Sequence, residues 1–254
     1  MTKTYSELSP ANAEISPQTY ARIGGLIYLV IIILGGLDEA FIRSRLIVSG
    51  DVATTSHNIM ASKELFRRSI VGDLLMQVCD IPSIVIFYIL LKPVSKSLSL
   101  LAAFFNLIQT AILGINKIYL LITLSFLGNE EYLKVFDPQQ RQALAYLSLD
   151  LHESGYGIGL IFFGFTCLVT GYLMFRSGYF PKIVGILQVV AGLSYLINSF
   201  AQILSPAFAA ALFPVILVPA FVGELATCLW LLVKGVNVRK WNERVGMGMS
   251  SVTI

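Results

Sequence analysis

Charged residues are scarce in this chain. Lys, Arg, Asp and Glu make up 13% of its 254 residues, whereas 56% are hydrophobic. This balance leaves too little polar surface to cover a soluble globule, so it excludes a water-soluble protein and predicts a membrane protein in contact with the lipid bilayer. The basic residues are spread over loop ends instead of forming one face, which argues against nucleic acid as a partner.

Residues that often carry chemistry are also few. The three cysteines, Cys79, Cys167 and Cys228, lie in apolar runs without C-x-x-C spacing, so they indicate neither a disulfide framework nor a thiolate metal site. With only His57 and His152, a three-histidine zinc site is impossible. The familiar hydrolase, metalloprotease, phosphate-loop and dinucleotide motifs are missing as well. The sequence identifies no cofactor, and it leaves open a metal site of one histidine and several carboxylates.

Long apolar runs, by contrast, are abundant. A membrane helix needs about 20 mostly apolar residues, and six segments meet that requirement, at roughly 20 to 42, 69 to 91, 97 to 127, 147 to 175, 182 to 204 and 208 to 233. We therefore predict an all-α, polytopic membrane protein with a bundle of six transmembrane helices in residues 20–235. A flexible tail at 1–19 and a second tail at 236–254 flank the bundle.

The basic residues predict the orientation. An even number of spans places both termini on one side, and the short loops on that side carry Lys92, Lys96, Arg176 and Lys182. Together with the basic residues of the two tails, they outnumber those of the long loops on the other side. The positive-inside rule then places both termini in the cytoplasm of a protein in the cell membrane.

The start of the fourth span is well marked. Asp137 is suited to cap a helix, with Pro138 at its first position and Gln140 three residues after the cap. A helix from there to the end of the span would be about 57 Å long at 1.5 Å per residue, whereas the bilayer core is about 30 Å thick. We expect this helix to bend or break near Gly155 and Gly157.

The spans also resemble one another. Arg22-Ile23-x-Gly25 matches Lys182-Ile183-x-Gly185, and at the same offset Asp38 falls on Asn198. We interpret this similarity as three helical-hairpin repeats, each made of an odd-numbered span and the even-numbered span that follows it. The alternative is that apolar helices with basic inner ends all look alike.

Several polar residues lie within the spans, mostly toward their outer ends. Asp80 and Glu224 are deeper, where no contact with headgroups explains them. An ionised group near the bilayer centre costs about 2.5 to 3.5 kcal/mol, so these side chains should face protein or water. We predict a polar cavity that opens outward and binds or transports a small molecule or a cation, and we expect Lys117 to pair with Asp38, Asp73 or Asp80. The predicted lining residues are Asp38, Asp73, Asp80, Asn116, Lys117, Asn198 and Glu224.

Asp150, His152 and Glu153, at the mouth of the fourth span, allow a different hypothesis. They are further candidates for the binding site, but they could also form the centre of an intramembrane hydrolase or transferase, with His152 as general base or metal ligand. On a helix His152 and Glu153 point about 100° apart, so the three groups converge only if the helix breaks. A third alternative is a structural or assembly protein whose acidic residues simply lie among lipid headgroups.

Four stretches carry a family resemblance. They are F-R-R-S-I-V-G-D-L-L-M at 66 to 76, L-D-L-H-E-S-G-Y-G at 149 to 157, F-R-S-G-Y-F-P-K at 175 to 182 and V-G-E-L at 222 to 225. With them the chain resembles, over nearly its whole length, the bacterial membrane-protein family known as domain of unknown function 4386. The resemblance implies a six-helix membrane protein and places Asp73, Asp150, His152 and Glu224 in the family's pattern. It implies no activity, substrate or catalytic residue.

Overall fold

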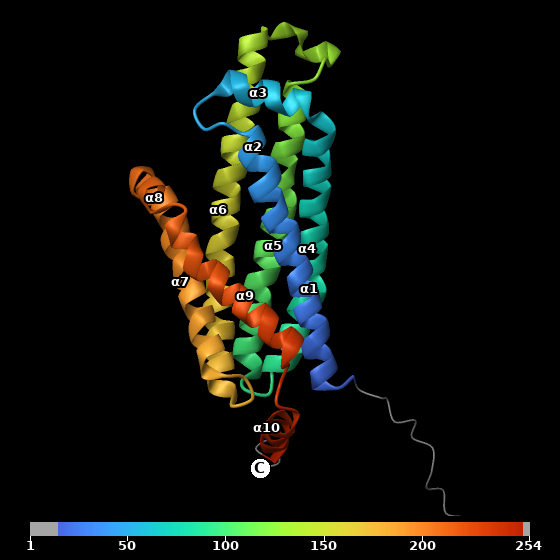
Figure 1. The fold of residues 1–254 in the computed structure, drawn as a ribbon, viewed down its shortest axis with the longest axis vertical. Helices are drawn as coiled ribbons and strands as arrows, with labels where there is room; N and C mark the ends of the chain where they lie inside the picture. The colour runs from blue at the N-terminus through green and yellow to red at the C-terminus, as the bar shows by residue number, and fades with distance from the viewer. Residues whose placement is uncertain (1–14, 251–254) are drawn as a thin grey trace, which may run out of the picture.

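A computed structural model describes residues 15–250, with side chains outside the description at 37–40 and 247–250. Within the described range all regular structure is helical and no strand is present (Figure 1). Most of the tail expected at residues 1–19 lies outside that range, and the first helix begins at Pro17.

Among residues 15–250, six helical segments are long and apolar enough to cross a membrane, which confirms the predicted fold class. Their helices are α1 (Pro17–Leu37), α4 (Lys63–Leu91), α5 (Lys96–Phe126), α6 (Pro138–Ser177), α7 (Lys182–Leu204) and α9 (Val218–Val233). The shorter elements are a π-helix (Asp38–Arg43), α2 (Ser44–Leu46), α3 (Val52–Ala61), α8 (Pro206–Leu212), α10 (Val238–Ser250) and 3-10 helices at Glu131–Val135 and Val215–Leu217.

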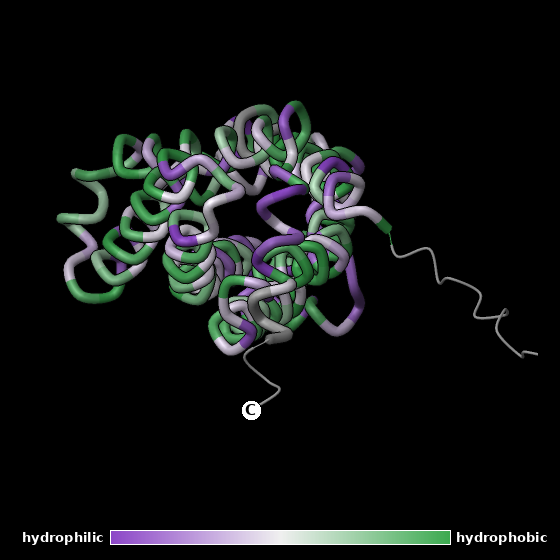
Figure 2. The backbone as a smooth tube through the Cα atoms, turned by 90° about the horizontal axis from the view of Figure 1, so that it is seen from below, coloured by the Kyte–Doolittle hydropathy of each residue, from purple (hydrophilic) through white to green (hydrophobic). Residues whose placement is uncertain are grey.

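The six long helices form a closed ring. Each packs against the next one along the chain, and α9 returns to pack against α1. The view along the bundle in Figure 2 shows this arrangement. Each predicted hairpin is therefore a pair of neighbouring helices, namely α1 with α4, α5 with α6 and α7 with α9. The internal repeat itself stays a prediction.

Glycines bring α6 and α7 into close contact. A Cβ atom added to Gly171 would lie 2.7 Å from the carbonyl oxygen of Gly185, and one added to Gly164 would lie 3.0 Å from the carbonyl oxygen of Gly192. Because lipid is as apolar as the helices themselves, helices in a bilayer associate through close van der Waals contact of this kind. The close approach of α6 and α7 therefore depends on these small residues.

α6 begins as predicted. The Asp137 carboxylate accepts a hydrogen bond from the Gln140 amide at 2.8 Å, and the Gln140 side chain accepts one from the Asp137 amide at 3.0 Å. Pro138 occupies the first turn, where its missing amide hydrogen is not needed.

α6 does not break near Gly155 and Gly157, because the helix runs without interruption to Ser177. A bend at this point, the other form of the expectation, stays a prediction. The extra length of α6 extends to the end of the bundle that carries α3, which packs against it (Figure 1). There the Gly50 amide donates a hydrogen bond of 2.8 Å to the Tyr146 hydroxyl. The two glycines instead make room for neighbours, since a Cβ atom on Gly155 would lie 2.2 Å from Asn116 Oδ1.

The last span is shorter than the predicted 208 to 233. α8 ends at Leu212 and α9 begins at Val218, with Pro214 between them. Proline has no amide hydrogen to continue a helix, so a single span cannot run through this point undisturbed.

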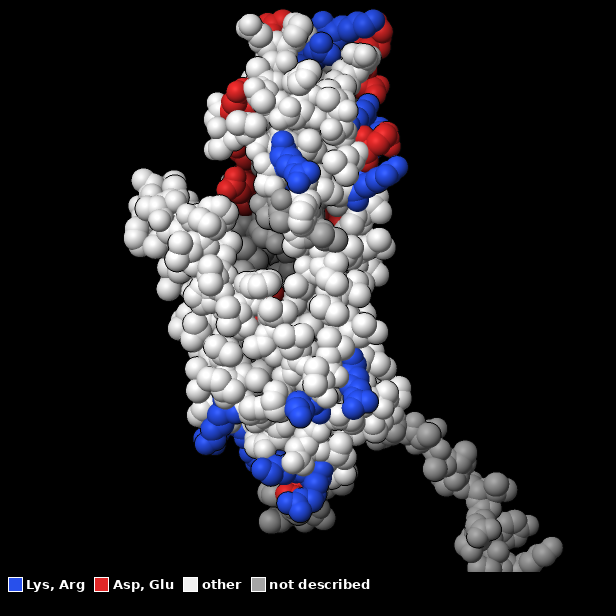
Figure 3. Space-filling model, viewed as in Figure 1, with Lys and Arg blue, Asp and Glu red and all other residues white. Residues whose placement is uncertain are grey.

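On the face shown in Figure 3, Lys and Arg gather at the two ends of the bundle, and the outer surface between the ends is mostly uncharged. We call one end the basic end; it carries Arg22, Lys92, Lys96, Arg176, Lys182 and Lys234. The opposite end, the far end, carries α3 and residues of both signs.

A cluster of buried apolar residues lies at each end. The basic-end cluster includes Leu90, Leu173 and Leu231, and the far-end cluster includes Ile59 and Leu120. The middle of the bundle, between these two clusters, contains the site described next.

Candidate functional site

The centre of the ring contains a cavity of about 240 Å³. All six long helices contribute to its walls. Along α6, its lining runs from Tyr156 to Thr170, between Leu149 of the far-end cluster and Leu173 of the basic-end cluster. Its polar lining side chains include Asp80, Ser83, Asn106, Gln109, Gln188, Tyr195 and Glu224.

Two carboxyl groups of the cavity lie at the depth of the bilayer centre. Measured along the helices at 1.5 Å per residue, Asp80 is about 18 Å from Lys92 and Glu224 is about 15 Å from Lys234. Both lysines are at the basic end, and the hydrocarbon core is about 30 Å thick. Asp80 and Glu224 are therefore in the middle of the membrane, as the sequence indicates.

The side chains around Asp80 leave hydrogen-bond acceptors unused. Thr110 donates its hydroxyl hydrogen to Asp80 Oδ2 at 3.3 Å. On the same helix, Gln109 Oε1 and Asn106 Oδ1 are buried without a hydrogen-bond partner among the described residues. This side of the cavity therefore offers oxygen atoms that accept hydrogen bonds.

Glu224 is held by α7. Its carboxylate accepts a hydrogen bond from the Tyr195 hydroxyl. Nearby, the Thr227 hydroxyl donates to Gln188 Oε1 at 2.9 Å, and Gln188 Nε2 donates to the sulfur of Cys167 at 3.3 Å. These bonds connect α9, α7 and α6 along one wall of the cavity.

Aromatic rings occupy much of the remaining wall. Phe163 and Tyr195 meet edge to face with ring centroids 5.3 Å apart, and Tyr28 and Phe87 do so at 6.0 Å. All four rings line the cavity. The carboxyl groups therefore face a chamber whose walls are otherwise aromatic and aliphatic.

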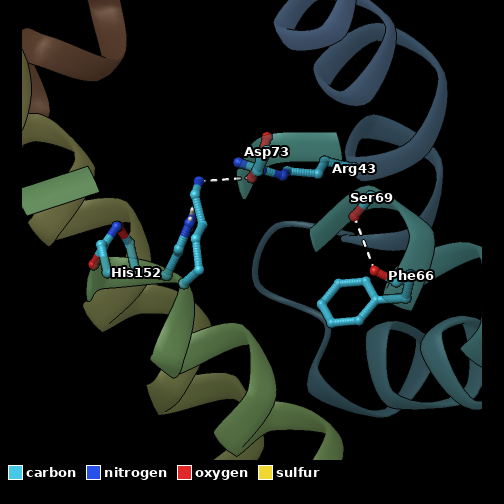
Figure 4. A network of polar contacts seen from close by, with 7 residues as sticks. Arg43, Phe66, Ser69, Asp73 and His152 are labelled. Atoms are coloured by element: carbon cyan, nitrogen blue, oxygen red, sulfur yellow. Dashed lines mark hydrogen bonds and ion pairs between the residues drawn. The ribbon is translucent and has the colours of Figure 1, made fainter. Parts of the chain in front are cut away.

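A second polar group, which we call the ion-pair cluster, lies nearer the far end (Figure 4). Lys117 Nζ is 2.6 Å from Asp73 Oδ2, and the Arg43 guanidinium is bonded to the same oxygen atom. The side chains of Lys117 and Asp73 are 2% and 3% exposed, so this pair is almost wholly removed from solvent. The structure thus confirms Asp73 among the partners predicted for Lys117.

His152 joins the cluster from α6. Its Nε2 atom is 3.3 Å from Lys117 Nζ. A lysine ammonium can only donate, so Nε2 accepts this hydrogen bond and the ring hydrogen is on Nδ1. Asn116 Nδ2 donates to the backbone oxygen of His152 at 2.8 Å, which also ties α5 to α6.

Tyr156 connects the cluster to the cavity. Its ring has Lys117 Nζ at 5.5 Å from the centroid and lies one helical turn from His152. The same side chain lines the cavity. The ion-pair cluster therefore lies beside the cavity on the side nearer the far end, and Tyr156 is the residue that contacts both.

The structure divides the predicted site residues. Asp80 and Glu224 line the cavity, whereas its described lining does not include Asp73, Asn116, Lys117 or Asn198. Asn198 is buried on α7, and its Oδ1 atom has no partner in the described part of the chain. The side chain of Asp38 lies outside the described residues.

The three groups at the mouth of α6 do not converge. Asp150 and Glu153 are exposed, whereas His152 is buried and faces Lys117. Among the described residues, no group of three or more His, Cys, Asp or Glu side chains is placed to hold a metal ion. This placement does not favour a hydrolase or transferase centred on Asp150, His152 and Glu153.

Arg43 is a site residue that sequence reasoning missed. The first span was expected to end at residue 42, which placed Arg43 in the following connection. In the structure the helical path continues through the π-helix and α2 to Leu46, and it brings Arg43 against Asp73. The sequence offered one signal. Arg43 lies one residue beyond the predicted first span, at the same end of the bundle as Asp73, which is near the start of the second span.

Comparison with known proteins places the chain in a family. The family model described as "Domain of unknown function (DUF4386)" matches residues 23–235, which extends from α1 to just beyond α9. The chain belongs to the DUF4386 family. The resemblance carried by the sequence motifs is thereby confirmed, and all six long helices of the ring are part of this DUF4386 domain.

A relative of this DUF4386 protein comes from the archaeon Archaeoglobus fulgidus and carries the name "Uncharacterized protein". It is 31% identical over 177 residues, which cover 70% of this chain and 88% of the relative. No solved structure matches. The relative is archaeal, so this comparison gives no support to the description of the family as bacterial.

Proposed function

We propose that this DUF4386 protein binds a small molecule or a cation in its central cavity and moves it across the membrane. The observation that carries the proposal is the pair of carboxyl groups, Asp80 and Glu224, in one cavity at mid-membrane depth. Intramembrane acids that face a cavity are typical of binding and transport sites, because an acid without such a role is too costly at that depth.

The basic residues support this proposal by their placement. Lys117 is paired with Asp73, and the described residues that line the cavity include no Lys, Arg or His. Within the described part of the chain, neither Asp80 nor Glu224 has a basic side chain within 4.0 Å. An ionised carboxylate in this position is stabilised best by a positive charge that the ligand supplies.

The orientation of the protein in the membrane is inferred from the charge of the two ends. We infer that the basic end faces the cytoplasm, because Lys and Arg are retained on that side of a membrane. The cavity would then lie between the cytoplasmic basic-end cluster and the external ion-pair cluster.

The proposal is tested by binding in lipid nanodiscs. The purified protein is heated with RbCl, choline chloride, 2-phenylethylamine, glucose or 3-phenylpropionate, and its unfolding temperature is recorded. We expect at least one of these compounds to raise the unfolding temperature of the wild type. The increase should be lost in the double variant Asp80→Asn, Glu224→Gln, because it removes both carboxylates and retains the side-chain shapes.

A matched control removes two exposed acids in the same way. The control variant is Glu130→Gln, Glu131→Gln. Both glutamates are in the connection before α6, far from the cavity in the fold. This variant should keep the wild-type response. A panel in which no compound stabilises the wild type, or in which the cavity variant responds as the wild type does, would contradict the proposal.

A further inference from the structure

We propose that the ligand of the central cavity is a small apolar organic amine, which enters from the lipid through a gap between α1 and α9 and places its ammonium group between Asp80 and Glu224. This inference rests on the proposed function and specifies the ligand class and its route.

The polar atoms of the cavity favour a ligand that donates hydrogen bonds. Asp80 and Glu224 present carboxylate oxygens, and Gln109 Oε1 and Asn106 Oδ1 are acceptors without a partner in the described structure. Gln109 is only 5% exposed, so its free oxygen faces no bulk water. A protonated amine carries several N–H donors and a positive charge, and it satisfies both the acceptors and the carboxylates at once.

The apolar walls favour an organic cation over a metal ion as the ligand. A hard metal ion such as Mg²⁺ or Ca²⁺ takes six or more oxygen ligands. Here the carboxyl groups are accompanied instead by aromatic rings, among them Tyr28, Phe163 and Phe221. Aromatic faces attract ammonium groups, and they pack well against the hydrocarbon part of an amine.

The volume limits the size of the ligand. A cavity of about 240 Å³ is near the lower end of the range of about 300–1,000 Å³ that is typical of ligand pockets. That space suits one aromatic or short aliphatic amine, and it is too small for a whole membrane lipid.

The route follows from an opening in the side of the bundle. Figure 3 shows the molecule hollowed between the upper half of α1 and α9, with acidic atoms visible at the upper left of the hollow and within it. Gly36 and Phe221 line the cavity there; both are exposed, and a Cβ atom on Gly36 would meet none of the described atoms within 4 Å. Along their helices, Gly36 is about 21 Å from Arg22 and Phe221 about 20 Å from Lys234, so the opening is within a hydrocarbon core of about 30 Å.

A ligand that arrives through this opening must first dissolve in lipid. The hydrocarbon part of an apolar amine partitions into the membrane, with its ammonium group near the headgroups. The opening lies in the half of the membrane away from the basic end, and Gly36 and Phe221, the lining residues named there, are uncharged. An inorganic ion has no comparable route through hydrocarbon.

The ligand class is tested with three probes that share a phenyl group and a short chain. Binding of 2-phenylethylamine, the neutral 2-phenylethanol and the anionic 3-phenylpropionate is measured by equilibrium dialysis in nanodiscs. We expect the amine to bind about ten- to hundredfold more tightly than the alcohol, which is the effect of one charge-assisted hydrogen-bonded group. Asp80→Asn and Glu224→Gln should each reduce amine binding by a similar factor, and each should reduce binding of the alcohol by a smaller factor, because the neutral hydroxyl lacks the charge that the carboxylate attracts.

A second measurement does not depend on the acidic variants. Ser83→Cys, in a Cys79→Ala background, introduces a thiol into the cavity wall. The amine should protect this thiol from a maleimide at concentrations at which the alcohol does not. Equal protection by the two compounds, or no protection by the amine, would overturn the inference.

The route is tested by filling the opening. Gly36→Trp should slow association of the amine at least about tenfold, while Gly114→Trp should not. Gly114 is the matched control because it also has open space beside it, on α5, and does not line the cavity. Equal association rates in the two variants would overturn the lateral route.

The outcomes separate this inference from the proposed function. If RbCl displaces the amine at similar concentrations, or 3-phenylpropionate binds as tightly, the assignment of the ligand class is wrong and the cavity is still a binding site. If none of the three phenyl probes binds but RbCl, choline or glucose stabilises the wild type, this inference fails and the proposed function stands. If no compound of either set binds to the wild type, both proposals fail.

Discussion

Asp73 of α4 and Lys117 of α5 form an ion pair of 2.6 Å that is almost wholly excluded from solvent. Asp80 lies two helical turns further along α4 and faces the cavity without a basic partner among the described residues. The two acids therefore differ in role, although they share a helix face. We assign Asp73 to the stability of the bundle and Asp80 to the ligand.

The ion-pair cluster should contribute strongly to stability. Asp73→Asn removes the carboxylate charge that both Lys117 and Arg43 contact, and loss of one partner from a buried pair typically costs about 3–5 kcal/mol. We expect a loss of that size in the free energy of unfolding, measured by denaturant titration in mixed micelles. The double variant Asp73→Asn, Lys117→Met should recover part of it.

An exposed pair of the same length provides the control. Lys134 and Glu131 are also 2.6 Å apart, but their side chains are 66% and 85% exposed. Because solvent screens such a pair, Lys134→Met should change stability by less than about 1 kcal/mol. Similar losses at the two sites would show that burial of the Asp73 pair has no energetic importance.

Close contact between α6 and α7 should tolerate no side chain at Gly171. A Cβ atom there would lie 2.7 Å from the carbonyl oxygen of Gly185, so Gly171→Ala should cost about 1–3 kcal/mol through overpacking. Gly114→Ala is the control, since its Cβ atom would meet no atom of the described residues within 4 Å. Thermal unfolding followed by circular dichroism compares the two, and an unchanged midpoint for Gly171→Ala would contradict the tight contact.

The loop at the basic end should make stability sensitive to alkaline pH. Burial raises the pKa of the Tyr179 phenol, whose hydroxyl donates to the Leu90 carbonyl at 2.7 Å. The unfolded chain then loses this proton first, near pH 10, so the stabilisation is complete below pH 10 and declines as the pH rises toward the native pKa. Tyr179→Phe should weaken the decline in unfolding free energy between pH 9 and 11. An identical slope in wild type and variant would exclude this role.

The inferred orientation can be measured with single cysteines in a Cys79→Ala background. Ser97→Cys is exposed at the basic end, and Glu130→Cys is exposed at the far end. In intact cells, a membrane-impermeant maleimide should label the cysteine at 130 and leave that at 97 unlabelled until the cells are opened. The reverse pattern would place the basic end outside.

The sequence predicts the helices better than their arrangement. Hydropathy locates the six spans, and local chemistry at Asp137 locates the start of α6, because both depend on residues close together in the chain. The neighbours of each helix depend on contacts between distant segments. The division of acids between the ion-pair cluster and the cavity, and the part that Arg43 plays, could therefore not be read from periodicity.

The uninterrupted course of α6 illustrates the same limit. Its length and its glycines predict a bend or a break when the helix is considered alone. In the structure α3 packs beside its far-end turns, and Asn116 fills the space at Gly155, so each feature has a tertiary reason. Sequence reasoning chose the local explanation, and contacts with other elements decided the outcome.

The most direct test of the central claim is a crystal structure of the protein with 4-bromophenylethylamine, in which anomalous scattering locates the bromine atom. The account predicts a bromine peak among the aromatic rings of the central cavity, with the ammonium group between Asp80 and Glu224. If a crystal grown with a saturating concentration of this amine shows bromine peaks at the lipid-facing surface and none in the cavity, the account is contradicted.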